Sequence, residues 1–416
     1  MLHQAVQGKR LRGISVCRRG PKVSHLFFAD DSIIFGRATE AKGSEILRIL
    51  KVYESSSGQQ MNKEKTSLYF SRNTGGEIQS KIKTMFSAQV IKQHETYLGL
   101  PSLIGRSKTN SFAQLKSKVA NKLSGWKEKL LSAADKEVLI KAVAQVVPTY
   151  TMSCFKFPEN LYDELTSMTR QFWWGKKKDE KKLAWVSWER MCQPKEIGGM
   201  GFRDLKSFNK ALLAKQGWRL QTNAQSLFSR VFKAKYFPDS EFTEASLGKH
   251  PSFAWRSIMS AQTVVKKGRK WRVGNGKSIQ IWSEDWLPSN SYPKILSTAQ
   301  PPWEGAKVSD LIVEDLGEWN SDVVRQLFSV EEADMILSIP LSKRLPGDRM
   351  VWSGTRNGNF SVSSAYHSIR ELGNINKAEC SDASGMKQLW KSIWNLNLPN
   401  KIRSFAWRAC REALAT

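Results

Sequence analysis

Two short, mainly apolar runs lie near the amino end of the chain, at residues 23–28 and 32–35, and two adjacent acids, Asp30 and Asp31, lie between them. Runs of this length on either side of a polar pair predict a β-hairpin. Its tip would hold both carboxylates side by side, and Mg²⁺ prefers oxygen ligands of this kind. The alternative interpretation is an ordinary surface turn, because Asp is a favoured turn residue.

Short elements of both kinds are expected as far as about residue 105. Apolar residues on a helical repeat predict a helix over residues 40–53, and the Ser- and Gly-containing stretch 55–58 should end it. Residues 67–70 (Ser-Leu-Tyr-Phe) have the composition of a strand, and the Tyr-Leu-Gly-Leu-Pro stretch at 97–101 closes this first segment.

Residues 106–225 are predicted to be helical and are strongly basic. Apolar residues recur there every three or four positions and predict one buried helical stripe. The residues of this stripe are Phe112, Leu115, Val119, Leu123, Trp126 and Leu130. Lysines lie between them, and Ser132 with Asp135 resembles a capping pair that opens a second helix, which we expect Pro148 to end.

Beyond residue 226 the pattern changes to strand-like runs separated by Gly and Asn. Residues 271–273 and 279–282 flank Gly274-Asn275-Gly276, and residues 350–352 and 360–362 flank Asn357-Gly358. Turn formers between such runs predict two β-hairpins. The fold class predicted for the whole chain is α+β.

The last part of the chain is expected to hold a helix, a linker and an amphipathic end. Ser363 or Ser364 should cap a helix that continues through Ile369. The polar stretch 373–385 has the composition of a linker, and the chain ends just after a segment rich in Trp, Phe and Arg.

The charge balance narrows the class of partner. The 416 residues contain 65 Lys and Arg against 38 Asp and Glu, a net charge of +27. Residues 106–225 alone contain 23 basic and 11 acidic residues, a net of +12. A protein this basic usually meets polyanions, and basic residues spread among aromatics favour nucleic acid. The alternatives are a basic surface kept for solubility, or attraction to anionic membranes.

The cysteine, histidine and hydropathy patterns argue against a disulfide-rich, zinc-binding, membrane-spanning or secreted protein. The five cysteines and five histidines are scattered, so neither a disulfide framework nor a zinc site is predicted. No apolar stretch approaches the roughly 20 residues of a membrane span. The first 19 residues are basic without an apolar signal core. We therefore expect an intracellular protein of the nucleus or cytoplasm, not secreted, with no membrane partner.

An ordered series of motifs begins at the acidic hairpin and continues almost to the end of the chain. The motifs are Phe28-Ala29-Asp30-Asp31, Ser57-Gly58-Gln59-Gln60-Met61-Asn62-Lys63-Glu64-Lys65-Thr66, Tyr97-Leu98-Gly99-Leu100-Pro101-Ser102, Leu123-Ser124-Gly125-Trp126, Phe172-Trp173-Trp174-Gly175, Trp185-Val186-Ser187-Trp188, Gly198-Gly199-Met200-Gly201-Phe202-Arg203-Asp204-Leu205, Trp390-Lys391-Ser392-Ile393-Trp394, Pro399-Asn400-Lys401-Ile402 and Phe405-Ala406-Trp407. This series resembles non-LTR, LINE-type retrotransposon reverse transcriptases of plants. Several ordered motifs are far more specific than any one, and they span nearly the whole chain.

The resemblance implies a domain order. Residues 1–105 would be the C-terminal part of the polymerase palm with its metal-site hairpin, and 106–225 the helical basic thumb and its extension. Residues 226–372 would form a Trp-rich, mixed α/β connector that contains hairpins. Residues 373–416 would be a linker and the truncated start of the family's zinc-binding region, so we expect no zinc in this chain.

The resemblance also implies a reaction and its residues. The reaction is RNA-directed DNA synthesis by two-metal nucleotidyl transfer, with Mg²⁺ held by Asp30 and, more weakly, Asp31. Lys65 aligns with a lysine that could neutralise or protonate departing pyrophosphate. A solvated lysine beside a turn is the alternative for Lys65. The expected partners are an RNA template and an RNA–DNA hybrid or DNA primer.

Contacts to nucleic acid are expected mainly from the helical basic segment. Lys116, Lys122, Lys127 and Lys129 are predicted phosphate contacts, and Trp173, Trp174, Trp185 and Trp188 are candidates for stacking on unpaired bases. Tryptophans at such spacing are more often core residues, which is the alternative for these four. The Lys-rich run 176–182 is expected to be a solvated loop.

Departures from the family pattern limit the expected activity. The upstream metal-binding aspartate, the nucleotide-selecting loop and the fingers should precede the hairpin by many tens of residues, but only 29 residues precede Asp30. We therefore expect no polymerase activity from the chain alone, and a missing N-terminal reverse transcriptase portion as a partner. The competing hypotheses are a non-catalytic nucleic-acid-binding remnant and a decayed gene product without function.

Overall fold

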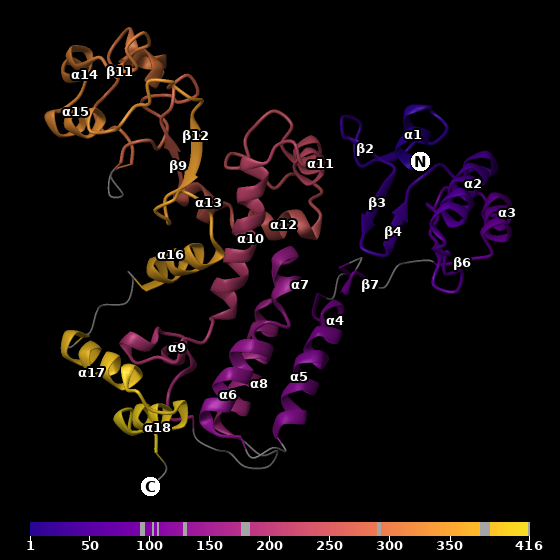
Figure 1. Ribbon diagram of the computed structural model, residues 1–416, viewed down its shortest axis with the longest axis horizontal. Helices are drawn as coiled ribbons and strands as arrows, with labels where there is room; N and C mark the ends of the chain where they lie inside the picture. Colours follow the sequence, from indigo (N-terminus) through magenta and orange to yellow (C-terminus); the bar gives the residue numbers. More distant parts are fainter. Residues whose placement is uncertain are drawn as a thin grey trace. The chain divides into compact units, whose positions relative to one another are not determined.

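The computed structural model describes residues 1–91, 96–101, 104–105, 108–127, 131–175, 184–288, 293–374 and 383–414. Helices predominate and every sheet in the described part has two strands, so the α+β prediction is confirmed (Figure 1). The chain divides into two compact units. The first comprises residues 1–121, 158–161 and 223–253, and the second comprises 122–157, 162–222 and 254–416.

The first unit contains short strands and helices around two small apolar clusters. Its elements are α1 (Leu2–Gln7), β1 (Ile14–Ser15), β2 (Lys22–Val23), β3 (His25–Phe28), β4 (Asp31–Ile34), α2 (Glu40–Ser57), β5 (Ser67–Leu68), α3 (Gly76–Phe86), β6 (Gln89–Val90), β7 (Thr96–Tyr97), β8 (Leu100–Pro101), α4 (Lys108–Ser111) and α11 (Leu227–Tyr236). The strand pairs are β1–β2, β3–β4 and β7–β8, all antiparallel, and the parallel pair β5–β6.

The helix predicted over residues 40–53 is confirmed and is one turn longer, as α2. Thr39 accepts a hydrogen bond from the Lys42 amide at its start, and Gly58 ends it with a φ of +71°. Glycine suits this position because it adopts positive φ without a Cβ clash. Buried Ile49 of α2 packs in one cluster with Ala5 and Leu11.

Helix α5 (Ala113–Lys127) spans the boundary between the units. Its predicted apolar stripe is confirmed as far as residue 126, because Val119 and Leu123 are buried and Trp126 contacts Phe172 with ring centroids 6.1 Å apart. Leu130, the last residue of the predicted stripe, lies outside the described residues. Phe112, just before the helix, is buried as well. Periodicity alone identified this stripe because helical neighbours three and four apart share a face.

The second unit contains most of the remaining helices. Their bounds are α6 (Ala133–Leu139), a π-helical turn (Ile140–Ala144), α7 (Thr149–Cys154), α8 (Glu159–Trp174), α9 (Trp188–Met191), α10 (Leu205–Thr222), α12 (Phe253–Met259), α13 (Gln262–Gly268), α14 (Ser321–Leu327), α15 (Val330–Leu337), α16 (Val362–Asn374), α17 (Ala383–Asn395) and α18 (Asn400–Cys410). Its 3₁₀ turns are Lys195–Ile197, Trp303–Gly305 and Val308–Leu311, and its strands are β9 (Arg269–Arg272), β10 (Ile312–Val313), β11 (Glu318–Trp319) and β12 (Arg349–Trp352).

The capping pair predicted at the start of α6 is confirmed. Ser132 and Asp135 each accept a hydrogen bond from the other's backbone amide, which is a complete capping box. Pro148 was expected to end this helix, but the chain passes through a π-helical turn first. Pro148 instead lies at the N-cap of α7, a position that tolerates proline because helix-start amides have no partner.

Both hairpins predicted beyond residue 226 are wrong. Strand β9 pairs with the distant β12, in the register Arg272 with Arg349, and residues 279–282 form no strand apart from a single bridge from Gln280 to Lys307. Residues 360–362 lead into α16 instead of returning along β12. The Gly274-Asn275-Gly276 turn is present, but it is stabilised by hydrogen bonds to Asp348 and not by a returning strand.

Asp348 replaces the cross-strand partner expected for this turn. Its Oδ1 accepts the amides of Gly274 and Gly276, each at 2.8 Å, and its Oδ2 accepts the amide of Ser278 at 2.8 Å. Three amides on one carboxylate fix the turn without a hairpin. This segment belongs to a Trp-rich core around Trp286, Ile281 and Ile336.

The helix predicted from Ser363 or Ser364 is confirmed as α16, but its cap is Ser361, whose Oγ accepts the Ser364 amide at 3.0 Å. The expected linker lies largely at residues 375–382, outside the described residues. The predicted boundaries of the four segments stay predictions.

Candidate functional site

The acidic pair lies at the tip of the predicted β-hairpin. Strands β3 and β4 pair antiparallel, with Phe28 opposite Asp31, so Ala29 and Asp30 form a two-residue turn. Ala29 has a φ of +50°, the left-handed conformation that tight hairpin turns need. Asp30 is in the turn and Asp31 is the first residue of β4, so the structure brings the two carboxylates together as predicted.

Both carboxylates are exposed, and neither has a hydrogen bond or ion pair with the described residues. They are therefore available to a cation. In the described part of the chain, however, no group of three His, Cys, Asp or Glu side chains could hold a metal ion. Two neighbouring carboxylates supply only part of the ligand set of a two-metal site. The described residues therefore do not complete such a site.

The hairpin that carries these acids has an uncovered apolar surface. Phe27 and Phe28 are each 61% exposed and Leu26 is 37% exposed. Strands β3 and β4 form a sheet of two, and His25 contacts Phe27 with ring centroids 4.9 Å apart. Successive strand residues face opposite sides, so both faces of β3 present aromatic rings to solvent.

Lys65 lies in a turn and is exposed. Its backbone amide donates to Asn62 Oδ1 at 3.0 Å, so the polypeptide around it is ordered by the turn itself. No hydrogen bond in the described residues joins Lys65 to Asp30 or Asp31. The structure therefore places Lys65 on the same unit as the acids without bringing it into contact with them.

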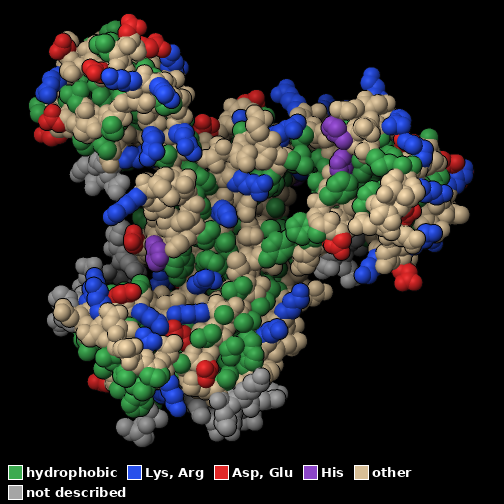
Figure 2. Space-filling view, in the orientation of Figure 1, with side chains coloured by type: hydrophobic (Ala, Val, Ile, Leu, Met, Phe, Trp, Pro, Cys, Tyr) green, Lys and Arg blue, Asp and Glu red, His purple; other side chains and the backbone are tan. Residues whose placement is uncertain are grey.

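The lysines of α5 lie beside its buried stripe. Lys118 and Lys122 are exposed and Lys116 is half-buried. The side chain of Lys127 and the whole of Lys129 lie outside the described residues, as does the Lys-rich run 176–182. The helix therefore buries its apolar side and offers cations from the rest of its surface. Figure 2 shows Lys and Arg side chains distributed over the visible face of the chain.

Trp173, one of the tryptophans predicted to stack on bases, is buried. Trp173 is 6% exposed, and its ring lies edge-on to Phe202 with centroids 5.3 Å apart. Trp173 is thus packed among the core residues of this unit. Trp174 is half-buried against Trp173, and Trp188 stacks on Phe202, whereas Trp185 is 43% exposed.

The Gly-Gly-Met-Gly motif forms a docking turn for the C-terminal helices, which the sequence did not reveal. Gly198 has a φ of +81°, and its carbonyl accepts hydrogen bonds from Trp407 Nε1 at 2.9 Å and from Arg411 Nη2 at 2.8 Å. The Arg411 guanidinium lies 4.6 Å from the ring centre of Trp390. Trp390 and Trp407 are buried, so α17 and α18 are anchored at this turn.

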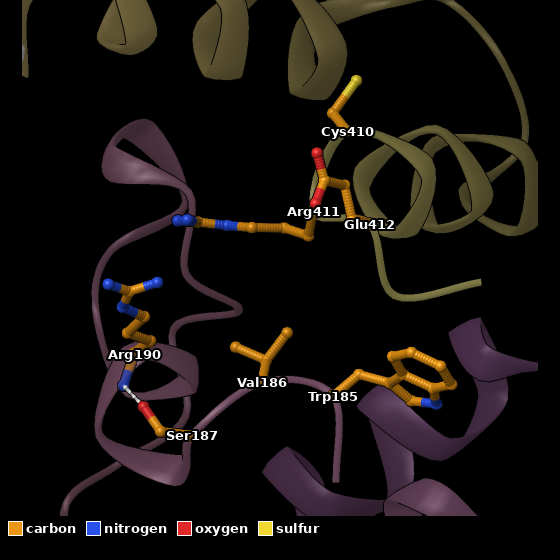
Figure 3. Close-up of a pocket in the computed structure, with 7 residues that line it drawn as sticks. All are labelled: Trp185, Val186, Ser187, Arg190, Cys410, Arg411 and Glu412. Atoms are coloured by element: carbon orange, nitrogen blue, oxygen red, sulfur yellow. Dashed lines mark hydrogen bonds between the residues drawn. The ribbon is translucent and has the colours of Figure 1, made fainter. Parts of the chain in front are cut away.

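A cavity of about 450 Å³ lies next to this docking turn (Figure 3). Its lining residues are Trp185, Val186, Ser187, Arg190, Cys410, Arg411 and Glu412. Figure 3 shows Arg190 and Arg411 on one side and Trp185 on the other. Burial lowers the pKa of Arg411, and the nearby charge of Arg190 lowers it further. The cavity is thus lined by two arginines, one carboxylate (Glu412) and one indole, together with Val186, Ser187 and Cys410.

No helix in the described part of the chain has the length and apolar character to cross a membrane. No protein-family model matches the chain. A protein of Arabidopsis thaliana named "Putative ribonuclease H protein At1g65750" is 29% identical over 327 residues, which cover 76% of this chain and 51% of that protein. The chain thus spans about half the length of that relative.

A second relative covers less of this chain but is matched almost entirely. The uncharacterized mitochondrial protein AtMg00310 of Arabidopsis thaliana is 41% identical over 142 residues, which cover 34% of this chain and 92% of the relative. The plant origin of both relatives agrees with the plant family that the motifs resemble. The chain belongs to the same family as the uncharacterized mitochondrial protein AtMg00310.

Proposed function

We propose that this chain is derived from the reverse transcriptase of a plant non-LTR retroelement and binds template–primer nucleic acid. The ordered motifs, the basic charge and the plant relatives support this origin. The observation that carries the binding function is α5, which buries Val119 and Leu123 and leaves Lys118 and Lys122 exposed in a segment of net charge +12. Lysines held on a rigid helix suit the phosphate backbone, whose recognition does not depend on base sequence.

Salt-titrated binding to an RNA–DNA hybrid tests this function. If five or six cations contact phosphates, the logarithm of the affinity should fall with the logarithm of salt concentration with a slope of about −5. Fluorescence anisotropy of a labelled hybrid of about 20 base pairs measures this slope. Asp30→Asn should leave it unchanged, because the exposed carboxylate makes no phosphate contact. A flat slope for the parent chain would overturn the proposal.

Catalysis is the second candidate, because Asp30 and Asp31 lie together at the hairpin tip without partners in the described residues. When bound, Mg²⁺ would supply the charge that activates the primer hydroxyl and holds the triphosphate. The two acids would be part of its ligand set, and Lys65 corresponds to the family's lysine by resemblance. We propose that the chain alone is inactive, because two carboxylates leave the developing charge incompletely neutralised.

Primer extension on an RNA template separates the two candidates. The purified chain should give no Mg²⁺-dependent product above a no-enzyme background. Extension that Asp30→Asn abolishes would instead establish a polymerase. Ser32→Ala is a matched control on the same hairpin, since the Ser32 hydroxyl is no ligand in the predicted site.

A further inference from the structure

Four lysines from three separate segments lie on α10 or on segments that pack against it. Lys206 and Lys210 lie four residues apart on this helix, which places them on the same face. Lys156 lies in the connection between α7 and α8, and Lys267 is in the last turn of α13. Lys156, Lys206 and Lys267 are exposed and Lys210 is half-buried. The sequence gives no sign of this cluster, because Lys156 and Lys267 are far from Lys206 and Lys210 along the chain.

Buried hydrogen bonds of Asn209 hold the segment of Lys156 against the helix of Lys210. The Phe157 amide donates to Asn209 Oδ1 at 2.9 Å. Asn209 Nδ2 donates to the carbonyls of Met152 and Phe155, at 2.6 and 3.0 Å. Asn209 is fully buried, so these bonds are protected from water. Lys156 directly precedes Phe157, and Lys210 directly follows Asn209, so the hydrogen bond between Phe157 and Asn209 fixes the backbone of the two lysines relative to each other.

The other side of Lys156 is fixed as well. Its amide donates to the buried Ser257 Oγ of α12 at 2.9 Å. Helix α13, which carries Lys267, packs against α10. The backbone positions of Lys156, Lys210 and Lys267 are therefore set by the packing of α10 with its neighbours. Only their flexible side chains can adjust.

The cluster concentrates positive charge. Burial lowers the pKa of Lys210, and the charges of Lys156, Lys267 and Lys206 lower it further. Each of these three neighbours repels the Lys210 ammonium. Like charges held together on a folded surface oppose folding, and a bound polyanion relieves that repulsion.

We propose that Lys156, Lys206, Lys210 and Lys267 form a second binding site for the phosphate backbone of nucleic acid, separate from α5. This inference rests on the proposed nucleic-acid-binding function. Lysine ammonium groups bind phosphate as point charges without a bidentate geometry. The site should therefore be insensitive to base sequence and strongly sensitive to salt.

The test compares two variants of equal net charge. The first carries Lys156→Gln, Lys206→Gln, Lys210→Gln and Lys267→Gln. The second carries the same change at four exposed lysines elsewhere: Lys9, Lys249, Lys343 and Lys391. Each variant loses four positive charges, so a general charge effect is the same in both. Thermal melts followed by circular dichroism establish that both fold like the parent chain.

Binding to the labelled hybrid is measured from about 50 to 200 mM KCl. The loss of four phosphate contacts should make the salt slope of the first variant less negative by about 3.6. Its affinity should then fall about 100-fold less than that of the parent chain across this range of salt concentration. The control variant should keep the parent slope to within about one. Single substitution of Lys210, the half-buried member, should reduce the slope by about one.

Each further outcome has one meaning. If the parent chain does not bind the hybrid, both the proposed function and this inference, which rests on it, are refuted. If the parent chain binds and both variants keep its slope, the inference alone is overturned. Binding of the parent chain to phosphatidylserine vesicles that only the cluster variant loses, with unchanged hybrid binding, would assign the cluster to anionic membranes and also overturn it.

Discussion

Gly198→Ala is the most informative single change in the docking turn. Gly198 has a φ of +81°, and an added Cβ would lie 2.2 Å from Arg411 Nη2 and 2.6 Å from Trp390 Cε2. Both distances are shorter than any normal contact. The alanine therefore strains the backbone and also displaces the two side chains that hold the C-terminal helices to this turn.

The expected loss of stability can be assembled from three contributions. A left-handed conformation costs a non-glycine residue about 1–2 kcal/mol. Hydrogen bonds from a charged donor such as Arg411 to the Gly198 carbonyl contribute about 1.5–3 kcal/mol. The stacking of that guanidinium on Trp390 contributes about 0.5–1 kcal/mol. The docking of α17 and α18 should therefore weaken by about 3–6 kcal/mol, the sum of these ranges.

Hydrogen exchange resolved by peptide measures this effect where it occurs. Amides of α17 and α18 should exchange at least about 100-fold faster in Gly198→Ala, because about 1.4 kcal/mol corresponds to a factor of ten in the opening equilibrium. Gly248→Ala is the matched control. Gly248 has a φ of +75°, and an added Cβ there would meet no atom within 4 Å, so it reports backbone strain without lost contacts.

The comparison of the two glycines can refute the reasoning. The Gly248 variant should lose only the strain contribution, and its C-terminal helices should exchange as in the parent chain. If Gly198→Ala leaves the exchange of α17 and α18 unchanged, Arg411 and Trp390 do not anchor these helices at the docking turn. A large change confined to other segments would have the same consequence.

Three further predictions concern buried or clasping groups. Burial, with the nearby charge of Asp204, raises the pKa of the Cys192 thiol to about 12, so iodoacetamide at about pH 8 should label exposed Cys410 and spare Cys192 until the chain is unfolded, as read by mass spectrometry. Burial raises the pKa of Glu332, but hydrogen bonds lower it more, so its net pKa is lowered. Its stabilising contribution should be present above the unfolded-state pKa and be lost as pH falls through the folded-state value, and Glu332→Gln should flatten the acid side of the melting-temperature profile. Asp348→Ala should destabilise the Trp-rich core by about 2–4 kcal/mol in urea unfolding, because three amides lose a charged acceptor. A urea-unfolding transition unchanged by Asp348→Ala would contradict a stabilising role for these three hydrogen bonds.

Local patterns predicted the elements whose determinants are close together in the sequence. The acidic hairpin, the apolar stripe of α5 and the Ser132 capping box were all predicted correctly. Each depends on residues within one or two turns of chain, so propensity, turn chemistry and periodicity suffice. The acids of the candidate metal site were found for the same reason, since two adjacent residues at a turn are brought together by the turn itself.

Long-range pairing was where local patterns failed. The Gly274-Asn275-Gly276 turn suggested a hairpin, but β9 takes β12 as its partner and Asp348 satisfies the turn amides. A turn dipeptide specifies the bend of the chain and not the strand that follows it. Which strand pairs with β9 is decided by the burial of Trp-rich surfaces far apart in sequence.

The sequence by itself determined the acidic hairpin tip, the amphipathic basic helix and the plant retroelement resemblance, because these lie in local order and residue type. Only the tertiary structure decided that Trp173 is buried, that the Gly198 carbonyl accepts hydrogen bonds from Arg411 and Trp407, and that Lys156 and Lys267 lie beside the helix of Lys206 and Lys210. The physical reason is that burial and charge repulsion depend on distances in space. Those distances arise only when helices that are separate in sequence pack together.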